Sequence, residues 1–290
     1  MRYSHVLGAA VVSLAAATAV EAGLSVSLVR TPISAAARSA DPTGLQVGRS
    51  RTFDLLVTAS GSDKWASGDL QFALSAGGTG ALYSPAGGSD IEQTGVPANV
   101  LFDSYVSTAA KVNAPSLLGK AQYPVESGVG TYVFSTSVVD TAWGDLSAAA
   151  NAQSSGRIAR LTLAGTKGGT VKGRVGATNN TASATFDIVV PVAGDLNGDG
   201  SVDNEDINPF VLALTDLPAY QAAYPNVNLL WAGDMSDDGL FDNEDINPFV
   251  DVLVNGGPVP AALGALVPEP TSAAVIAAGL FGLVGRRRRI

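Results

Sequence analysis

One eight-residue sequence, NEDINPFV, occurs twice in this chain of 290 residues, at Asn204–Val211 and again at Asn243–Val250. The copies start 39 residues apart, and each follows an acidic stretch that contains glycine: GDLNGDGSVD before the first and GDMSDDGLFD before the second. An identical repeat of this length indicates a duplicated structural unit. The fold must therefore hold two similar units, each made of a carboxylate cluster followed by a helix.

The acidic stretches have the spacing of oxygen ligands around a hard cation. When Asp195 and Asp234 are counted as position 1, side-chain oxygens recur at positions 1, 3, 5, 9 and 12, and a glycine stands at position 6. Position 7 offers its backbone carbonyl, as in the calcium loop of an EF-hand. The sequence therefore predicts two bound Ca²⁺ ions. The predicted ligands are Asp195, Asn197, Asp199, Ser201, Asp203 and Asp206 in the first loop, and Asp234, Ser236, Asp238, Leu240, Asp242 and Asp245 in the second.

The two loops differ at position 3, where the first has Asn197 and the second has Ser236. An amide carbonyl reaches further than a serine hydroxyl and is a better calcium ligand. We therefore expect the first site to bind calcium more tightly than the second.

Each loop is followed by a predicted helix. Asp203 or Asn204 can cap the first turn, and Asn208 and Asn247 are predicted as second N-caps because a proline follows each of them at N1. The apolar residues of each helix fall on one face, and we expect the two faces to pack on each other. These residues are Ile207, Phe210, Val211 and Leu214 in the first helix and Ile246, Phe249, Val250 and Leu253 in the second.

No helix is predicted to lead into the first loop, because SATFDIVVPVAG alternates like a strand and contains Pro191. Two loop-plus-exit-helix units in tandem, over Gly194–Val254, resemble the type I dockerin, a small all-α module with paired calcium loops. The resemblance implies a cohesin-like protein partner. Positions 10 and 11 are Asn204-Glu205 and Asn243-Glu244, where the best-known dockerins often have small hydroxyl residues.

Charge is distributed very unevenly along the chain. Residues 191–258 carry 13 acids and no Lys or Arg, whereas residues 23–190 carry 11 acids and 12 bases. Such an acidic segment needs cations to compact, and the chain lacks the basic face of a nucleic-acid-binding protein. The chain has no Cys, and its one His is His5. Catalysis through a Ser-His-Asp or Cys-His arrangement is therefore not expected, and we predict that the protein is not an enzyme.

Both ends of the chain resemble export signals. Residues 1–22 have a basic start, an apolar run and small residues before Gly23, as in a secretory signal peptide. Near the other end, Thr271–Val284 is an apolar run followed by Arg286–Arg289, which predicts a short transmembrane helix with the basic block on the cytoplasmic side. Together with Val267-Pro268-Glu269-Pro270 this end resembles the PEP-CTERM sorting signal. That resemblance implies transient anchoring in the membrane and cleavage by an exosortase-type enzyme.

Residues 23–191 are predicted to form a β-sandwich, because short alternating runs such as LSVSLVRT and ATFDIVV are separated by Gly/Ser turns. AGTKGGTVKG is interpreted as a hairpin with its turn at Gly168-Gly169. The layout is loosely similar to cohesin and carbohydrate-binding sandwiches. The predicted organisation is a mainly β chain with a signal peptide at 1–22, a sandwich at 23–191, a calcium-binding module at 192–256, and a linker with the sorting and anchor segment at 257–290.

The sequence thus favours an exported, non-catalytic protein of the cell surface or extracellular matrix, with a role in assembly or adhesion. The alternative is a carbohydrate-binding protein or weak glycosidase that recognises a polysaccharide. For that alternative, Trp65 and Trp143 are the candidate sugar-stacking residues, or else core residues, and Asp140 and Asp145 are the candidate carboxylate pair.

Overall fold

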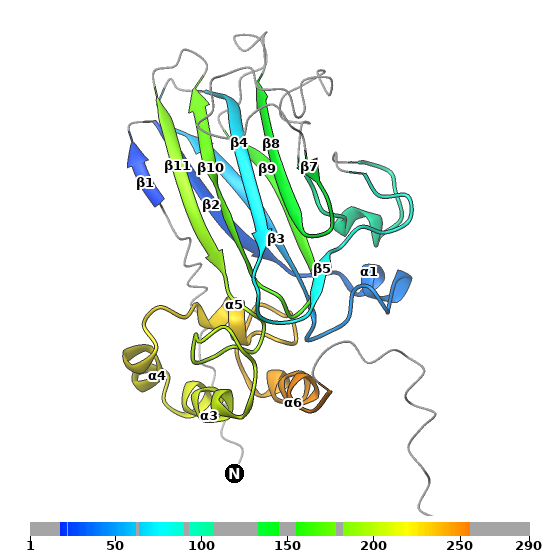
Figure 1. Ribbon diagram of the computed structural model, residues 1–290, viewed down its shortest axis with the longest axis vertical. Helices are drawn as coiled ribbons and strands as arrows, with labels where there is room; N and C mark the ends of the chain where they lie inside the picture. Colours follow the sequence, from blue (N-terminus) through cyan, green and yellow to red (C-terminus); the bar gives the residue numbers. More distant parts are fainter. Residues whose placement is uncertain are drawn as a thin grey trace, which may run out of the picture. The chain divides into compact units, whose positions relative to one another are not determined.

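The computed structural model describes residues 18–21, 23–61, 64–89, 93–106, 133–144, 155–177 and 182–255. These residues form two antiparallel β-sheets and several short helices, which confirms the expected mainly β class (Figure 1). The strands are β1 Thr18–Glu21, β2 Leu24–Thr31, β3 Ser50–Ala59, β4 Trp65–Leu74, β5 Gly80–Leu82, β6 Tyr105–Val106, β7 Val133–Phe134, β8 Val138–Gly144, β9 Ser155–Gly165, β10 Gly169–Ala177 and β11 Ser183–Val190.

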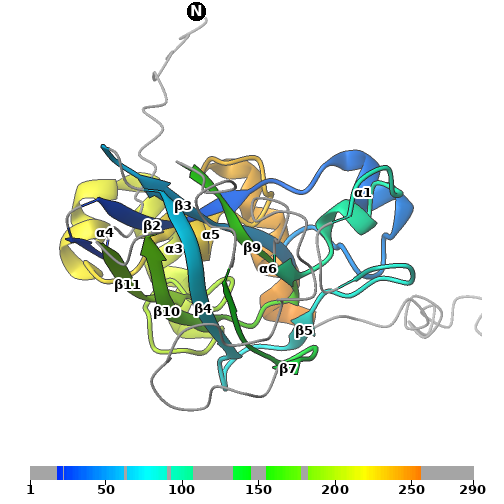
Figure 2. The ribbon, with the colours of Figure 1, turned by 90° about the horizontal axis from the view of Figure 1, so that it is seen from above.

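The two sheets lie face to face (Figure 2). The first has the order β1-β2-β3-β9-β5, with β6 also paired to β9, and the second has the order β11-β10-β4-β8-β7. Strand β11 shows why the sequence pattern predicted strands well. Its buried residues Ala184, Phe186, Ile188 and Val190 alternate with exposed ones, so that only one face of the strand enters the core.

The predicted hairpin at Gly168-Gly169 is wrong. Strand β9 pairs with β3, β5 and β6, whereas β10 pairs with β4 and β11, so the segment between β9 and β10 crosses from one sheet to the other. At this crossing a Cβ on Gly168 would lie 2.2 Å from the Val190 carbonyl oxygen. Glycine is needed here for close packing of two backbones, which gives the same sequence signal as a tight turn.

The core lies between the sheets and contains side chains of both. Leu28, Phe53 and Ile158 come from the first sheet and Leu70 and Phe186 from the second, and all are nearly inaccessible to solvent. Tight burial of branched and aromatic side chains supplies most of the stabilisation of such a sandwich.

The helices are α1 Ala35–Ala40, α3 Ile207–Thr215, α4 Leu217–Ala223, α5 Leu229–Gly233 and α6 Ile246–Asn255, with 3-10 turns η1 Val100–Phe102, η4 Asn204–Asp206 and η5 Asn243–Asp245. Figure 1 shows α3 to α6 gathered at the end of the sandwich where β11 finishes. We call residues 192–255 the helical module. As the sequence predicted, the first acidic loop is entered from a strand, β11.

The helical module shares a core with the sandwich. Trp231 of α5 belongs to the sandwich core, with its ring centroid 5.4 Å from that of Phe53 on β3 in an edge-to-face arrangement, and Leu230 packs against the same cluster. The described residues accordingly all belong to one compact unit. The domain boundary between 191 and 192 stays a prediction.

No helix within the described parts of the chain has the length and apolar character needed to cross a membrane. The apolar run that predicted a transmembrane helix, Thr271–Val284, lies outside the described residues, as do residues 1–17 of the predicted signal peptide. Residues Thr18–Glu21 of that predicted segment form β1, which pairs with β2.

Candidate metal-binding loops

The first acidic loop is organised by the carboxylate at position 1. Asp195 accepts hydrogen bonds from the backbone N–H groups of Gly198 at 2.7 Å, Asp199 at 3.2 Å and Gly200 at 2.8 Å. The φ angles of Gly198 and Gly200 are +81° and +91°, a region where glycine is favoured because it has no side chain. The sequence thus curls the loop around the carboxylate of Asp195.

The carboxylate at position 12 closes the same loop. Asp206 is fully buried and accepts from the backbone N–H groups of Leu196 at 2.8 Å, Asn197 at 3.1 Å and Asp203 at 2.9 Å. Positions 1 and 12 are therefore both turned into the loop, where they hold its backbone.

The second loop repeats this arrangement. Asp234 accepts from the N–H groups of Asp237 at 2.7 Å and Gly239 at 3.0 Å. Asp245 is fully buried and accepts from Met235 at 2.7 Å, Ser236 at 2.8 Å and Asp242 at 2.8 Å. The repeat in the sequence is thus also a repeat in three dimensions.

The carboxylates at positions 5 and 9 bond locally instead. Asp199 Oδ1 accepts from Ser201 N–H at 2.8 Å, and Asp203 Oδ1 accepts from Glu205 N–H at 2.8 Å. In the second loop Asp238 Oδ1 accepts from Leu240 N–H at 2.9 Å and Asp242 Oδ1 from Glu244 N–H at 2.7 Å. The residues at position 7, Ser201 and Leu240, are exposed.

The position-3 side chains also lie within their loops. The amide oxygen of Asn197 accepts from Asp199 N–H at 2.8 Å, and its amide nitrogen is 3.0 Å from Asp199 Oδ2. The hydroxyl of Ser236 is 3.5 Å from Asp234 Oδ1. All twelve predicted ligands therefore lie in two matching loops.

Asp203 and Asp242 also begin the helices that follow. Each accepts a backbone N–H of the next turn and forms a reciprocal capping box with Asp206 or Asp245. The predicted cap at Asp203 is thereby confirmed, but the predicted second N-caps Asn208 and Asn247 are wrong. Helices α3 and α6 already begin at Ile207 and Ile246, because η4 and η5 lead directly into them and proline is tolerated in a first helical turn.

The helices of the two units pack on each other as expected, but through a narrower face. The rings of Phe210 and Phe249 stack with centroids 4.3 Å apart, and Ala213 and Val252 are also buried. Four residues predicted for the packed faces point outward instead: Ile207 is 42% exposed, Val211 51%, Ile246 38% and Val250 47%. The contact thus runs through Phe210 and Phe249, and the flanking apolar positions are left exposed.

The buried carboxylates carry charge that the module itself does not neutralise. Burial raises the pKa values of Asp195, Asp206 and Asp245, although backbone hydrogen bonds oppose this increase. Burial also raises the pKa of Asp234 to about 6, with a smaller increase from the neighbouring charges of Asp245 and Asp237 and an opposing effect of Arg30. A cation in each loop would reverse these effects, because it favours the ionised form.

The donor chemistry suits calcium, since every predicted ligand offers oxygen and several are anionic. In the part of the chain that the structure describes, no group of three or more His, Cys, Asp or Glu side chains is gathered closely enough to hold a metal ion as it stands. At positions 5 and 9, one oxygen of each carboxylate is bonded to a nearby backbone N–H group.

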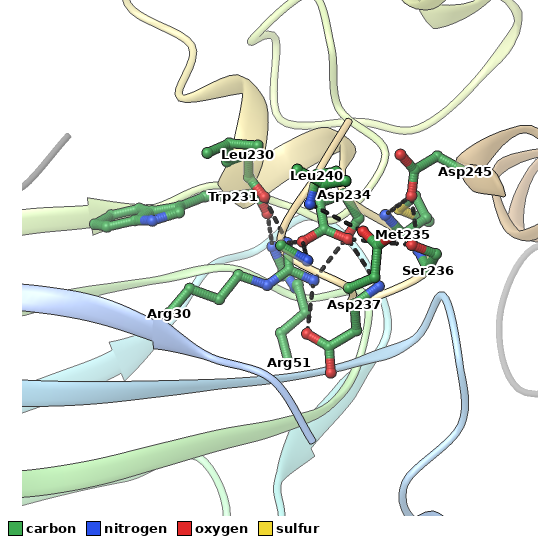
Figure 3. A network of polar contacts seen from close by, with 12 residues as sticks. Arg30, Arg51, Leu230, Trp231, Asp234, Met235, Ser236, Asp237, Leu240 and Asp245 are labelled. Atoms are coloured by element: carbon green, nitrogen blue, oxygen red, sulfur yellow. Dashed lines mark hydrogen bonds and ion pairs between the residues drawn. The ribbon is translucent and has the colours of Figure 1, made fainter. Parts of the chain in front are cut away.

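Three basic residues that were not predicted from the sequence contact the second loop and the helix before it from outside. Arg38 of α1 reaches Asp237 at 2.7 Å. Figure 3 shows the other two: Arg30 of β2 reaches Asp237 at 3.0 Å, and Arg51 of β3 donates to the Trp231 carbonyl at 2.8 Å. One signal was available: position 4 is Gly198 in the first loop but Asp237 in the second. Its partners are about 200 residues away in the sequence and could not be inferred from it.

The residues proposed for sugar binding receive little support. Trp65 is 1% exposed and belongs to the sandwich core, so that it cannot stack on a sugar ring. Asp140 lies on β8 with its carboxylate 3.5 Å from the Gln71 amide. Asp145 lies outside the described residues, and so does the side chain of Trp143.

Comparison with known proteins identifies one segment. Residues 266–289 match the PEP-CTERM protein-sorting motif, which confirms the predicted sorting signal. The match indicates that the protein is exported to the cell envelope or surface and processed by exosortase-type machinery.

No curated protein matches the chain. Among solved structures, a DUF4466 family protein from Parabacteroides merdae is similar, with 12% sequence identity and a TM-score of 0.24. The similarity covers 58% of this chain and 43% of that one, so the chain spans less than half of that protein's length. A likeness of this size carries no argument about fold or function.

Proposed function

We propose that this protein is a non-catalytic component of the cell surface or extracellular matrix whose helical module binds two Ca²⁺ ions. The observation that carries the proposal is the repetition of a loop in which the carboxylates at positions 1 and 12 are buried together. Residues 191–258 contain no Lys or Arg, and of these four carboxylates only Asp234 has an ion pair among the described residues, with Arg30 at 3.4 Å. Calcium supplies the missing positive charge, and its binding energy then contributes to the stability of the module.

In this proposal the ligands predicted from the sequence hold the ions. Asp195, Asn197, Asp199, Ser201, Asp203 and Asp206 serve the first ion, and Asp234, Ser236, Asp238, Leu240, Asp242 and Asp245 serve the second. The similarity of the module to type I dockerins supports a role in assembly, with a cohesin-like protein as the partner class. The PEP-CTERM motif at residues 266–289 supports delivery to the surface before such assembly.

Titration calorimetry of the purified chain tests calcium binding directly. We expect two Ca²⁺ ions per wild-type chain, one for Asp195→Ala, one for Asp234→Ala and none for the double variant. Mg²⁺ should bind much more weakly, because it gives up its water ligands reluctantly. Calcium at 100 times the dissociation constant should stabilise the native state by about 2.7 kcal/mol per site.

Glu205→Gln is the matched control, since it removes an exposed acid of the first unit that is not a predicted ligand. This variant should still bind two ions. A wild-type chain that binds no calcium at millimolar concentration, or a double variant that binds as many ions as the wild type, would refute the proposal.

A further inference from the structure

The two loops differ at position 4. Gly198 has a φ of +81° in the first loop, and Asp237 has a φ of +66° in the second, which makes it the one non-glycine residue with positive φ in the described part of the chain. This backbone conformation is unfavourable for aspartate, so contacts of its side chain must offset the strain. Asp237 is also only 6% exposed, which excludes an ordinary solvated surface acid.

The contacts of Asp237 come from the sandwich. Its carboxylate accepts from Arg30 at 3.0 Å, from Arg38 at 2.7 Å and from the backbone N–H of Ile33 at 2.7 Å. Asp237 therefore holds Arg30 and Arg38 against the second loop. Figure 3 shows the contact with Arg30.

Arg30 also reaches the carboxylate at position 1. Its guanidinium donates to the backbone carbonyls of Leu230 and Asp234, and its Nη1 lies 3.4 Å from Asp234 Oδ2. The side chains of Arg30 and Asp234 are 8% and 1% exposed, so that solvent screens this pair poorly. A positive charge thus stands beside a predicted calcium ligand.

The first loop has no such partner. Within the described residues no ion pair reaches Asp195, Asp199, Asp203 or Asp206. At the second loop, Arg30 and Arg38 add two positive charges and Asp237 adds one negative charge, which makes the surroundings more positive by one unit. Arg51, which is buried and bonded to four carbonyl oxygens, lies close enough to Arg30 and Asp237 to add to this field.

We propose that Arg30 is an internal counter-ion of the second loop and sets the order in which the two sites bind calcium. Its charge holds the second loop together without metal and repels an incoming Ca²⁺, so that the first site binds first. The inference rests on the proposed calcium binding and adds a physical basis for unequal sites that is independent of Asn197 and Ser236.

The test uses the full chain with the Asp195→Ala substitution, in which only the second site remains. Calcium affinity is measured by calorimetry with and without Arg30→Gln. The counter-ion role predicts that Arg30→Gln tightens binding about tenfold, because a positive charge close to the ion is removed. In the same background Asp237→Asn should weaken binding, because it leaves the arginine charges less compensated. If each substitution merely disordered the second loop, both variants would bind calcium more weakly, and that outcome overturns the proposal. An unchanged affinity for Arg30→Gln overturns it as well.

Arg49→Gln is the matched control. Arg49 joins the sandwich to the helical module through Asp251 on α6 at 2.8 Å, but it is not bonded to either loop. This variant should leave calcium affinity unchanged. If Arg30→Gln does not fold, Arg30→Lys replaces it. Lysine keeps the positive charge but cannot reproduce the forked contacts of the guanidinium, so calcium binding should not become tighter. Tighter binding with lysine would show that the shape of the guanidinium opposes calcium rather than its charge, which overturns the proposal.

Melting temperatures measured without calcium test this inference separately from the proposed function. Without calcium, the melting temperatures of Arg30→Gln, Asp237→Asn and the double variant form a cycle, in which the double variant should lose less than the sum of the single losses. Strictly additive losses would overturn the counter-ion role even if calcium binds. Absence of calcium binding with a clear coupling in this cycle would refute the proposed function, and the binding order with it, but would leave the role of Arg30 as counter-ion of the metal-free loop in place.

Discussion

Replacing Trp231 with alanine should destabilise the sandwich and the helical module together. Trp231 belongs to α5 but is 6% exposed within the sandwich core, where its ring meets Phe53 edge to face at 5.4 Å. The substitution removes the largest side chain that joins the two parts. It leaves the Trp231 carbonyl, which accepts from Arg51, in place.

The magnitude follows from the buried area. An aromatic side chain buries about 150–250 Å², which at about 25 cal/mol per Å² corresponds to roughly 4–6 kcal/mol as an upper estimate. Tryptophan-to-alanine changes in protein cores cost about 3–5 kcal/mol. For a folded unit of this size, such a loss lowers the melting temperature by about 6–20 °C.

The assay is urea unfolding of the full chain, combined with hydrogen exchange read by mass spectrometry. Exchange protection in β2 and β3 and in α3 and α6 should disappear in one transition, at a lower urea midpoint than in the wild type. Val254→Ala is the control, since Val254 is 75% exposed, and it should change the free energy of unfolding by less than about 0.5 kcal/mol. If Trp231→Ala lowered protection only in α3 and α6 and left the sheets unchanged, the shared core would be refuted.

Two further predictions concern the sandwich and its contact with the first loop. Asp54 on β3 accepts two hydrogen bonds of 2.8 Å from Arg160 on β9. Burial alone would raise the pKa of the Asp54 carboxyl. The hydrogen bonds and charge of Arg160 outweigh this effect of burial and lower the pKa below its ordinary value of 3.8. The folded state therefore holds the charged form more strongly than the unfolded state, and this stabilisation is present above pH 3.8 and lost as the pH falls through the folded-state pKa. Urea midpoints should show that Asp54→Asn is less stable than the wild type at pH 7 and loses less stability between about pH 4 and pH 2. Asp187→Asn, at an exposed position, is the control. If Asp54→Asn and the wild type lost equal stability over this pH range, the pKa of Asp54 would not be the cause. Separately, a Cβ on Gly77 would lie 1.8 Å from the carbonyl oxygen of Gly200 in the first loop, so Gly77→Ala should cost about 1–3 kcal/mol in thermal unfolding. The control Ala76→Ser changes the exposed neighbouring residue and should cost less than about 0.5 kcal/mol. A Gly77→Ala chain as stable as the wild type would show that the two backbones can move apart freely.

Local patterns were enough to locate most strands. Alternation of apolar and polar residues predicted strands at Leu24–Thr31, which is β2, and at Ala184–Val190, which is β11 without its first residue. A strand with one face in the core must alternate in this way. The same pattern carries no information on pairing. It therefore placed β9 and β10 in one hairpin, although the two strands belong to different sheets.

The prediction of which helix residues are buried was wrong for a related reason. The apolar positions of α3 were identified correctly, but the buried subset depends on how a neighbouring helix approaches. Stacking of Phe210 on Phe249 takes the centre of that contact and leaves Val211 exposed. Helical periodicity fixes which residues share a face and leaves open how much of that face is covered.

By itself, the sequence determined the repeat of two acidic loops, the spacing of their oxygen-bearing side chains, the strand that enters the first loop and the sorting motif at residues 266–289. These features are local, because each depends on residues that lie close together in the sequence. Only the tertiary structure decided which loop has a counter-ion. Arg30 and Asp237 are 207 residues apart, and a charge contact over such a separation exists only after the helical module has packed on the end of the sandwich.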